Sequence, residues 1–155
     1  MRHHGVVGRR ILAVAADERI RSAVKLALED EGWTVDEAES GEQAIEMFQR
    51  SNPDVVLIDI MLPGIDGFEL CRRIRENPDW AEIPIIFLSS ADDKELIVRA
   101  FDSGGVDYIT KPFHAAEVKA RVQAHLAMAQ MKAQLHSQNT LLEQMVEKKT
   151  QEIKD

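Results

Sequence analysis

The chain has 155 residues, of which 45% are hydrophobic and 30% are charged, and its formal net charge is −8. This balance is typical of one globular domain with an appendage, and the longest apolar runs are too short to span a bilayer. Because Cys71 is the single cysteine, the chain cannot form an internal disulfide framework, which fits a reducing cytosol. We expect Cys71 to serve in the packing of a helix.

Charge is distributed unevenly along the chain. Residues 1–113 contain 13 Lys and Arg against 22 Asp and Glu, whereas residues 114–155 contain 6 against 5. A nucleic-acid backbone is bound by clustered positive charge, so we expect no nucleic-acid binding by this chain. The first ten residues are basic but lack the apolar stretch of a secretory signal. We therefore expect a cytoplasmic protein with no membrane partner.

Short apolar runs alternate with helical patterns over the first 110 residues. The runs predict strands at residues 11–14, 33–37, 55–59, 84–89 and 106–110. The segments between them predict helices over residues 19–32, from Ser40 onward, over 68–76 and over 92–103. In the first, the apolar residues Ile20, Val24, Leu26 and Leu28 recur near helical spacing. Ser40 should cap the second, with Gln43 three residues on as an imperfect capping box. Strands that alternate with helices predict a doubly wound α/β fold with a parallel sheet and right-handed crossovers.

Polar residues stand where three of the predicted strands end. Asp59 ends the third strand, Ser89 ends the fourth, and Lys111 follows the fifth. The carboxyl ends of parallel strands share one edge of the sheet, so these side chains should meet there. These groups suit phosphoryl transfer to a carboxylate. The carboxylate of Asp59 can act as the nucleophile, the ammonium group of Lys111 can neutralise phosphoryl oxygens, and the hydroxyl of Ser89 can bond to them.

Two segments carry a resemblance to a known family. The segment DVVLIDIMLPGIDG at residues 54–67 resembles the signature around the phospho-acceptor of response-regulator receiver domains. The segment YITKPF at residues 108–113 resembles the lysine segment of that family. The resemblance covers about residues 9–127, which we expect to form one receiver domain. It implies a five-stranded flavodoxin-like receiver fold with strand order 2-1-3-4-5.

The resemblance also assigns roles to residues. It implies that Asp59 is the phospho-acceptor, that Ser89 and Tyr108 are the switch residues, and that Lys111 pairs with the phosphoryl group. It further implies a cis peptide bond between Lys111 and Pro112, which is chemically feasible because proline follows.

The sequence departs from the family where the first strand ends. Receiver domains carry two adjacent acidic residues there that hold Mg²⁺, but these positions are Ala15 and Ala16. Asp59 and the backbone carbonyl of Met61 remain as expected ligands, and Asp17 is a weak replacement candidate. Mg²⁺ is usually held by carboxylates together with phosphate oxygens and waters, so we expect weakened binding. The alanines fit either a natural pseudo-receiver or an engineered loss of metal binding.

Residues from 115 onward contain no Gly or Pro and predict a long helix. Val118, Val122 and Leu126 recur at i, i+4 and i+8 and should face the sheet. Residues 128–155 are expected to form a helical extension in which apolar residues recur at heptad spacing, interrupted at Gln138. This seam predicts a coiled coil between two copies; the alternative is an overhanging solvated helix. The members of the seam are Met128, Met131, Leu135, Leu142 and Met145.

We therefore expect a two-component signalling receiver rather than an enzyme, with a sensor histidine kinase or phosphotransfer protein and a second copy as partners. A dehalogenase-type phosphatase would need a second Asp where Met61 stands. A flavodoxin-like FMN site would need hydroxyls and free amides in the first loop, where Asp17 and Glu18 would instead repel a phosphate. The alternative within signalling is a phosphorylation-independent pseudo-receiver that acts as a dimerisation or docking module.

Overall fold

The computed structural model describes residues 9–90 and 94–154. Predictions that fall on residues 1–8, 91–93 and 155 lie outside the described residues. These include the basic start of the chain, the first two residues of the helix expected from 92, and the last residue of the extension. Within the described ranges no helix is both long and apolar enough to cross a membrane.

In the described residues, five parallel strands form one sheet in the order β2-β1-β3-β4-β5, as the resemblance implies. The strands are β1 (Arg10–Val14), β2 (Thr34–Ala38), β3 (Val55–Asp59), β4 (Ile85–Ser89) and β5 (Asp107–Thr110). The helices are α1 (Glu18–Leu28), α2 (Gly41–Ser51), α3 (Gly67–Glu76), α4 (Lys94–Asp102) and α5 (Ala115–Lys154), with a short 3₁₀ helix, η1 (Glu29–Glu31), after α1. The doubly wound α/β prediction is confirmed.

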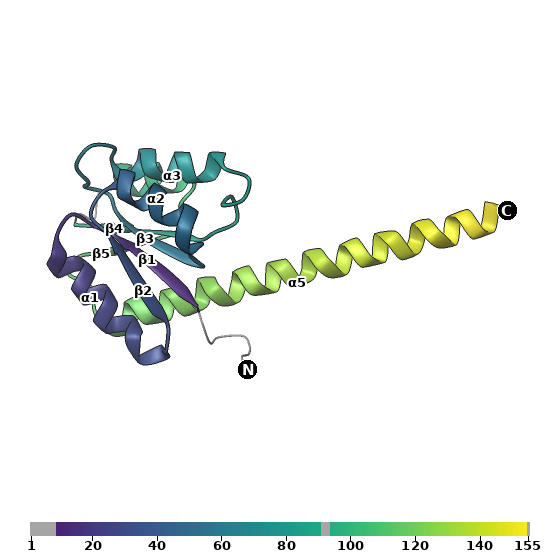
Figure 1. The fold of residues 1–155 in the computed structure, drawn as a ribbon, viewed down its shortest axis with the longest axis horizontal. Coiled ribbons are helices and arrows are strands. Elements are labelled where there is room, and N and C mark those ends of the chain that lie inside the picture. Colours follow the sequence, from purple (N-terminus) through teal and green to yellow (C-terminus); the bar gives the residue numbers. More distant parts are fainter. Residues whose placement is uncertain (1–8, 91–93, 155) are drawn as a thin grey trace.

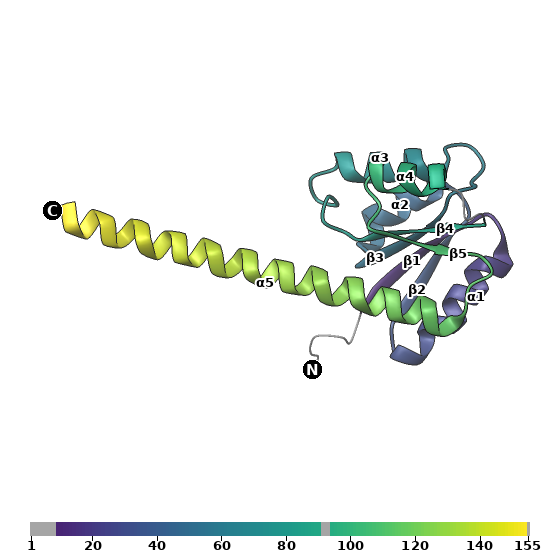
Figure 2. The ribbon, with the colours of Figure 1, turned by 180° about the vertical axis from the view of Figure 1, so that it is seen from behind.

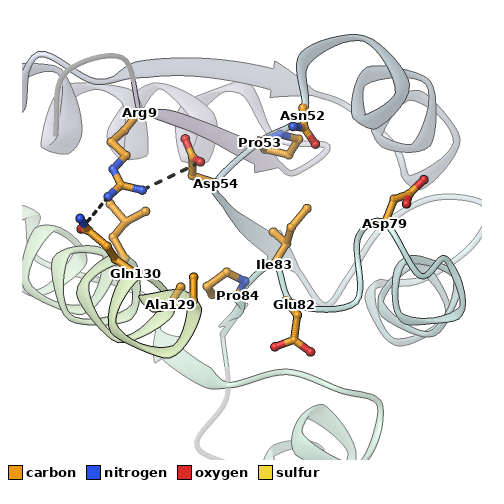
Figure 3. Close-up of a pocket in the computed structure, with 12 residues that line it drawn as sticks. Arg9, Asn52, Pro53, Asp54, Asp79, Glu82, Ile83, Pro84, Ala129 and Gln130 are labelled. Atoms are coloured by element: carbon orange, nitrogen blue, oxygen red, sulfur yellow. Dashed lines mark hydrogen bonds and ion pairs between the residues drawn. The ribbon is translucent and has the colours of Figure 1, made fainter. Parts of the chain in front are cut away.

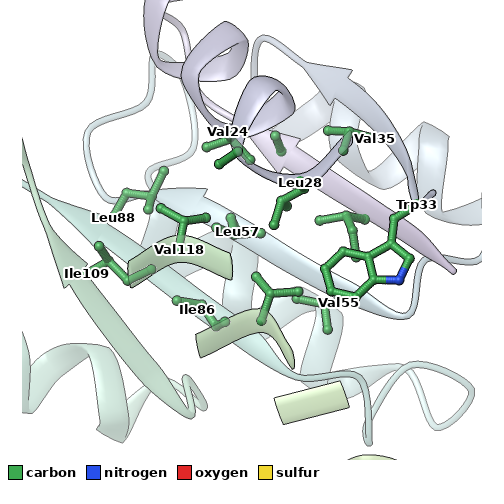
Figure 4. Packing of buried hydrophobic residues seen from close by; sticks show 14 of the residues in the cluster. Val24, Leu28, Trp33, Val35, Val55, Leu57, Ile86, Leu88, Ile109 and Val118 are labelled. Carbon is green, nitrogen blue, oxygen red and sulfur yellow. The ribbon is translucent and has the colours of Figure 1, made fainter. Parts of the chain in front are cut away.

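The helices cover the sheet in two layers. Helices α2, α3 and α4 lie against one face and α1 and α5 against the other, while α5 continues far beyond the domain (Figures 1 and 2). Each face has its own apolar core, because the central strands β3 and β4 are buried on both sides. Figure 4 shows the core under α1 and α5, where Val24 and Val118 approach Leu57 and Ile86 of the sheet.

Several element boundaries follow from visible capping residues. Ser40 caps α2 as predicted, since its hydroxyl accepts a hydrogen bond from the Gln43 N–H at 3.1 Å. The Gln43 side chain bonds back to the N–H of Glu39 rather than to Ser40. Helix α1 ends at Leu28, earlier than residue 32, and Gly32 adopts φ 77° after the 3₁₀ turn.

Two local predictions were wrong. The second strand begins at Thr34 rather than at Trp33, whose side chain is buried although it precedes the strand. Leu26 shares its helix with buried Val24 and Leu28, yet its side chain is 72% exposed. Its position is two residues from both, which on an α-helix is the opposite face.

Candidate functional site

Three strand ends meet at the carboxyl edge of the sheet. Asp59 is the last residue of β3 and pairs in register with Leu88, so Ser89 lies one residue beyond it. Ser89 is level with Thr110, and its carbonyl oxygen accepts a 2.6 Å hydrogen bond from the Lys111 N–H. The register therefore places Asp59, Ser89 and Lys111 on neighbouring strands at one edge, as their positions in the sequence predict.

The carboxylate of Asp59 is buried and engaged by two donors. Its Oδ2 lies 2.9 Å from Nζ of Lys111, and its Oδ1 accepts a 3.0 Å hydrogen bond from the Met61 N–H. The Asp59 residue is only 4% exposed. The predicted acceptor and the predicted phosphate-pairing lysine are thus in direct contact, and the amide of Met61 fixes the orientation of the carboxylate between them.

The loop after Asp59 is shaped by two residues of the signature. Asp66 caps α3, since its side chain accepts a 2.9 Å hydrogen bond from the Glu69 N–H. Gly67 follows, where an added Cβ would lie 2.8 Å from the carbonyl oxygen of Asp59. The close return of the chain to the end of β3 therefore requires glycine at position 67.

The two predicted switch residues lie on adjacent strands. Ser89 is 3% exposed at the end of β4. Tyr108 of β5 is half-buried, and its ring meets Phe101 of α4 edge-on at a centroid separation of 6.3 Å. The peptide bond between Lys111 and Pro112 is cis, as the resemblance implies.

The degenerate acidic pair lies beside the acceptor. Val14 is level with Ile58, so the next residue, Ala15, comes level with Asp59. Ala15 is fully buried, whereas Ala16 is exposed. A methyl group therefore occupies the inner of the two positions that bear carboxylates in the family.

Arg21 holds the loop that contains these alanines. Its NH1 group donates hydrogen bonds of 2.7 and 3.1 Å to the carbonyl oxygens of Ala15 and Ala16. Its Nε donates to Glu37 at the end of β2, at 3.0 Å. Reasoning from the sequence missed this residue, although a signal existed: Arg21 stands at i−3 and i−7 from buried Val24 and Leu28, on the core side of α1.

The side chain of Asp17 already makes its contacts at the start of α1. Its carboxylate caps α1 by accepting from the Arg19 N–H at 2.8 Å, and it also pairs with the Arg19 guanidinium at 3.0 Å. The pKa of Asp17 lies below its ordinary value, chiefly because of the hydrogen bonds from the Arg19 side chain and backbone, with a smaller lowering by the charge of Lys111. Capping and pairing thus compete with any use of Asp17 as a metal ligand.

The donor set at this edge does not fit a Mg²⁺ site of the ordinary kind. Across the part of the chain that the structure describes, no three His, Cys, Asp or Glu side chains form a group that could hold a metal ion. The buried carboxylate at this edge, Asp59, is already paired with a cation. Mg²⁺ gives up its waters reluctantly and is usually held through carboxylates, which Ala15 and Ala16 do not supply.

A second charged cluster was not predicted from the sequence. Asp107 begins β5, and its carboxylate lies 2.9 Å from NH1 of Arg121 and 3.0 Å from Nε2 of His125, both on α5. The cluster ties the edge strand to α5. Its members are remote in sequence from Asp107 and become neighbours only when α5 packs beside the sheet.

The family profile of the response regulator receiver domain matches residues 11–123. The chain belongs to this family. Among relatives, it is 43% identical over 116 residues to the transcriptional regulatory protein CseB of Streptomyces coelicolor, covering 75% of this chain and 48% of CseB. It is 42% identical over 120 residues to the transcriptional regulatory protein ResD of Bacillus subtilis, covering 77% and 49%. The chain thus spans about half the length of the curated relatives that it matches.

Solved structures agree with the family. A putative response regulator from Chloroflexus aurantiacus matches with a TM-score of 0.75 and 35% identity, over 77% of this chain and 98% of that one. The chemotaxis response regulator CheY4 of Vibrio cholerae matches with a TM-score of 0.73 and 26% identity, over 77% and 99%. Receiver domains are signalling modules that generally bind Mg²⁺ and interact with histidine kinases or phosphotransfer proteins. The signalling prediction is confirmed at that level.

Proposed function

We propose that this chain is a two-component receiver whose phospho-acceptor is Asp59 and whose metal binding and phosphorylation are impaired. The observation that carries the proposal is the local charge around the acceptor. Asp59 faces Lys111, while the level position directly after β1 is the methyl group of Ala15. One carboxylate and one ammonium leave the site close to neutral, whereas the family's acidic pair would make it attractive to a divalent cation.

The reaction at Asp59 needs a phosphoryl donor. With acetyl phosphate, a carboxylate oxygen of Asp59 attacks phosphorus, the bond to the acetate oxygen breaks, acetate leaves, and a mixed anhydride remains. Lys111 offsets one negative charge of the incoming group. Positioning and charge stabilisation provide nearly all the catalysis in phosphoryl transfer, so the loss of the acidic pair should lower the rate.

The roles of the remaining site residues follow from their positions. A phosphoryl group on Asp59 would add negative charge and strong acceptor oxygens beside Ser89. The Ser89 hydroxyl would bond to it, and Tyr108 would turn into the space that is freed. Helix α5 begins directly after this segment and would carry the change onward. We infer a receiver over residues 9–127 and a transmitting extension over residues 128–155.

The partners that this function implies are a sensor histidine kinase or phosphotransfer protein and a second copy of the chain through α5. CseB and ResD are transcriptional regulatory proteins, but the acidic receiver segment of this chain favours protein partners over direct nucleic-acid contact. The second candidate function is a pseudo-receiver that docks or dimerises without phosphorylation. The buried Ala15 favours it; the retained Asp59–Lys111 pair favours the first.

Mass measurement after incubation with acetyl phosphate and Mg²⁺ tests the proposal. We expect slow or undetectable labelling of the unmodified chain and substantial acceleration in Ala15→Asp/Ala16→Asp. The same double variant carrying Asp59→Asn should stay unlabelled, which assigns the site. Rapid labelling of the unmodified chain that is abolished by Asp59→Asn would refute the impairment. A double variant that stays inert would favour the pseudo-receiver.

A further inference from the structure

Helix α5 presents a long apolar face beyond the receiver. The helix has 40 residues, about 60 Å at 1.5 Å per residue, and roughly two thirds of it extends past the last buried residue, Leu126. Large apolar side chains that are between 52% and 66% exposed recur along this part. They are Met128, Met131, Leu135, Leu141, Leu142, Met145 and Val146.

The receiver occupies the opposite side of the helix. Val118, Val122 and Leu126 pack into the core, and the next turn continues on the same side. Ala129 and Gln130 line an open groove at the base of the sheet, where Gln130 accepts a 3.0 Å hydrogen bond from Arg9 (Figure 3).

Leu135 lies nine residues beyond Leu126, which is about two and a half helical turns and therefore the opposite face. Most of the apolar face thus points away from the receiver of its own chain, and Leu135 borders a groove that Glu82 and Lys132, paired at 2.7 Å, also line. A second helix can lie along it without displacing that receiver.

We propose that two copies of the chain associate through this face as a parallel, in-register coiled coil, an inference that rests on the homodimer of the proposed function. The heptad positions decide the orientation. Gln138 is the polar residue in the seam formed by Met128, Met131, Leu135, Leu142 and Met145. In a parallel, in-register pair, Gln138 meets Gln138 of the partner, and the two amides bond to each other. A polar seam residue that pairs with itself fixes register in this way.

The antiparallel arrangement with the same overlap is poorer. Met128 would then face Met145 of the partner, and each Gln138 would face Leu135. Two amides would lie against leucine side chains, which leaves their donors and acceptors unsatisfied.

The positions that flank the seam favour the same orientation. In a parallel coiled coil, the g position of one helix lies beside the e position five residues later on the other. This places Gln134 beside Asn139 and Leu141 beside Val146. In these two pairs a polar side chain meets a polar one and an apolar side chain meets an apolar one, while the first pair, Ala127 with Lys132, is mixed. None of these residues belongs to the site around Asp59, so the seam can form without phosphorylation.

Cysteine cross-linking of the full chain tests the orientation. Under mild oxidation, Gln138→Cys should form a disulfide-linked dimer at least about tenfold more than Thr140→Cys, because only position 138 faces its own copy. Thr140 lies on the outer face of the same helix turn and is the matched control. The dimer formed by Gln138→Cys should persist in the Asp59→Asn background.

Sedimentation of the unmodified chain distinguishes a wrong helix orientation from the absence of a homodimer. A dimer in which Gln138→Cys does not cross-link alone, but does cross-link when mixed with Leu135→Cys, would overturn the parallel register and leave the homodimer intact. A chain that is monomeric at micromolar concentration would refute the homodimer, and the face would then belong to the helix of another protein. Equal cross-linking at positions 138 and 140 would also overturn the proposal.

Discussion

Nζ of Lys111 lies 2.9 Å from Oδ2 of Asp59, and the two side chains are 19% and 6% exposed. The pair joins the segment after β5 to the end of β3 across β4. Removing one member of a buried ion pair costs more than the pair contributes, because the remaining charge stays buried. The residues that would receive a phosphoryl group are therefore coupled to the stability of the fold.

Lys111→Met should lower the free energy of unfolding by about 1–3 kcal/mol at neutral pH, because among the described residues the carboxylate of Asp59 would keep only the Met61 N–H as a partner. Urea denaturation measures the loss. Asp59→Asn/Lys111→Met is the matched control: with no buried charge left, its loss should be smaller than that of Lys111→Met. Additive effects of the two substitutions would show that the pair is not coupled.

Mg²⁺ should not stabilise the unmodified chain, because the donor set around Asp59 lacks further carboxylates. In Ala15→Asp/Ala16→Asp the melting temperature should fall without metal, since position 15 is fully buried, and rise again when Mg²⁺ is added. At a Mg²⁺ concentration of a hundred times Kd, binding adds about 2.7 kcal/mol to the free energy of unfolding. This raises Tm by about 5–10 °C in a chain of this size. A saturable rise in the unmodified chain would identify Asp17 as a working replacement ligand.

The sequence predicted the sheet and the centre of the site because both depend on local patterns. Uniformly apolar runs identified β3 and β4, and the ends of those strands located Asp59 and Ser89. Element boundaries were less predictable where a side chain is buried outside a strand, as Trp33 is. Leu26 shows that apolar character alone does not predict burial, because an apolar residue on a helix need not face the core.

Arg21 and Asp107 were missed for a different reason. Arg21 stabilises the β1–α1 loop by bonding to carbonyl oxygens. The helical spacing places Arg21 on the core side of α1, but no sequence pattern identifies the carbonyl oxygens that it binds. Asp107 gains its partners from α5, which lies beside β5 only in the folded chain. Contacts of this kind depend on packing between elements, so they become visible once the topology places those elements together.

The cluster at the start of β5 predicts a pH dependence of stability. Burial would raise the pKa of Asp107, but hydrogen bonds from His125, the Tyr108 N–H and Arg121 outweigh it, so the pKa lies below the ordinary 3.8. A carboxyl whose pKa is lower in the folded chain than in the unfolded chain stabilises the fold. This contribution is fully present when the pH is above the pKa of the unfolded chain, and it is lost as the pH falls through the pKa of the folded chain. Asp107→Asn should therefore cost about 1–3 kcal/mol near neutrality and less below about pH 4.

Urea denaturation at several pH values between 3 and 7 checks the expectation for Asp107. Glu143→Gln is the control, because Glu143 is an exposed acidic residue on α5 beyond the receiver. It should leave the pH profile unchanged. An Asp107→Asn profile parallel to that of the unmodified chain over the whole range would contradict the argument.

Truncation after Leu126 should separate folding from association. The retained part keeps Val118, Val122 and Leu126, which are the α5 residues in the core, so its receiver should unfold cooperatively. It loses the whole apolar face and should sediment as a monomer.

Gln138→Leu in the full chain is the opposite change, because it replaces the polar seam residue by an apolar one. We expect tighter association by about tenfold or more together with a less unique register, since a lone polar seam residue gives specificity at the expense of stability. Sedimentation over a concentration series measures both variants. A truncated chain that remains dimeric would place the interface on the receiver itself, and a Gln138→Leu chain that dissociates more readily would show that position 138 lies outside the seam.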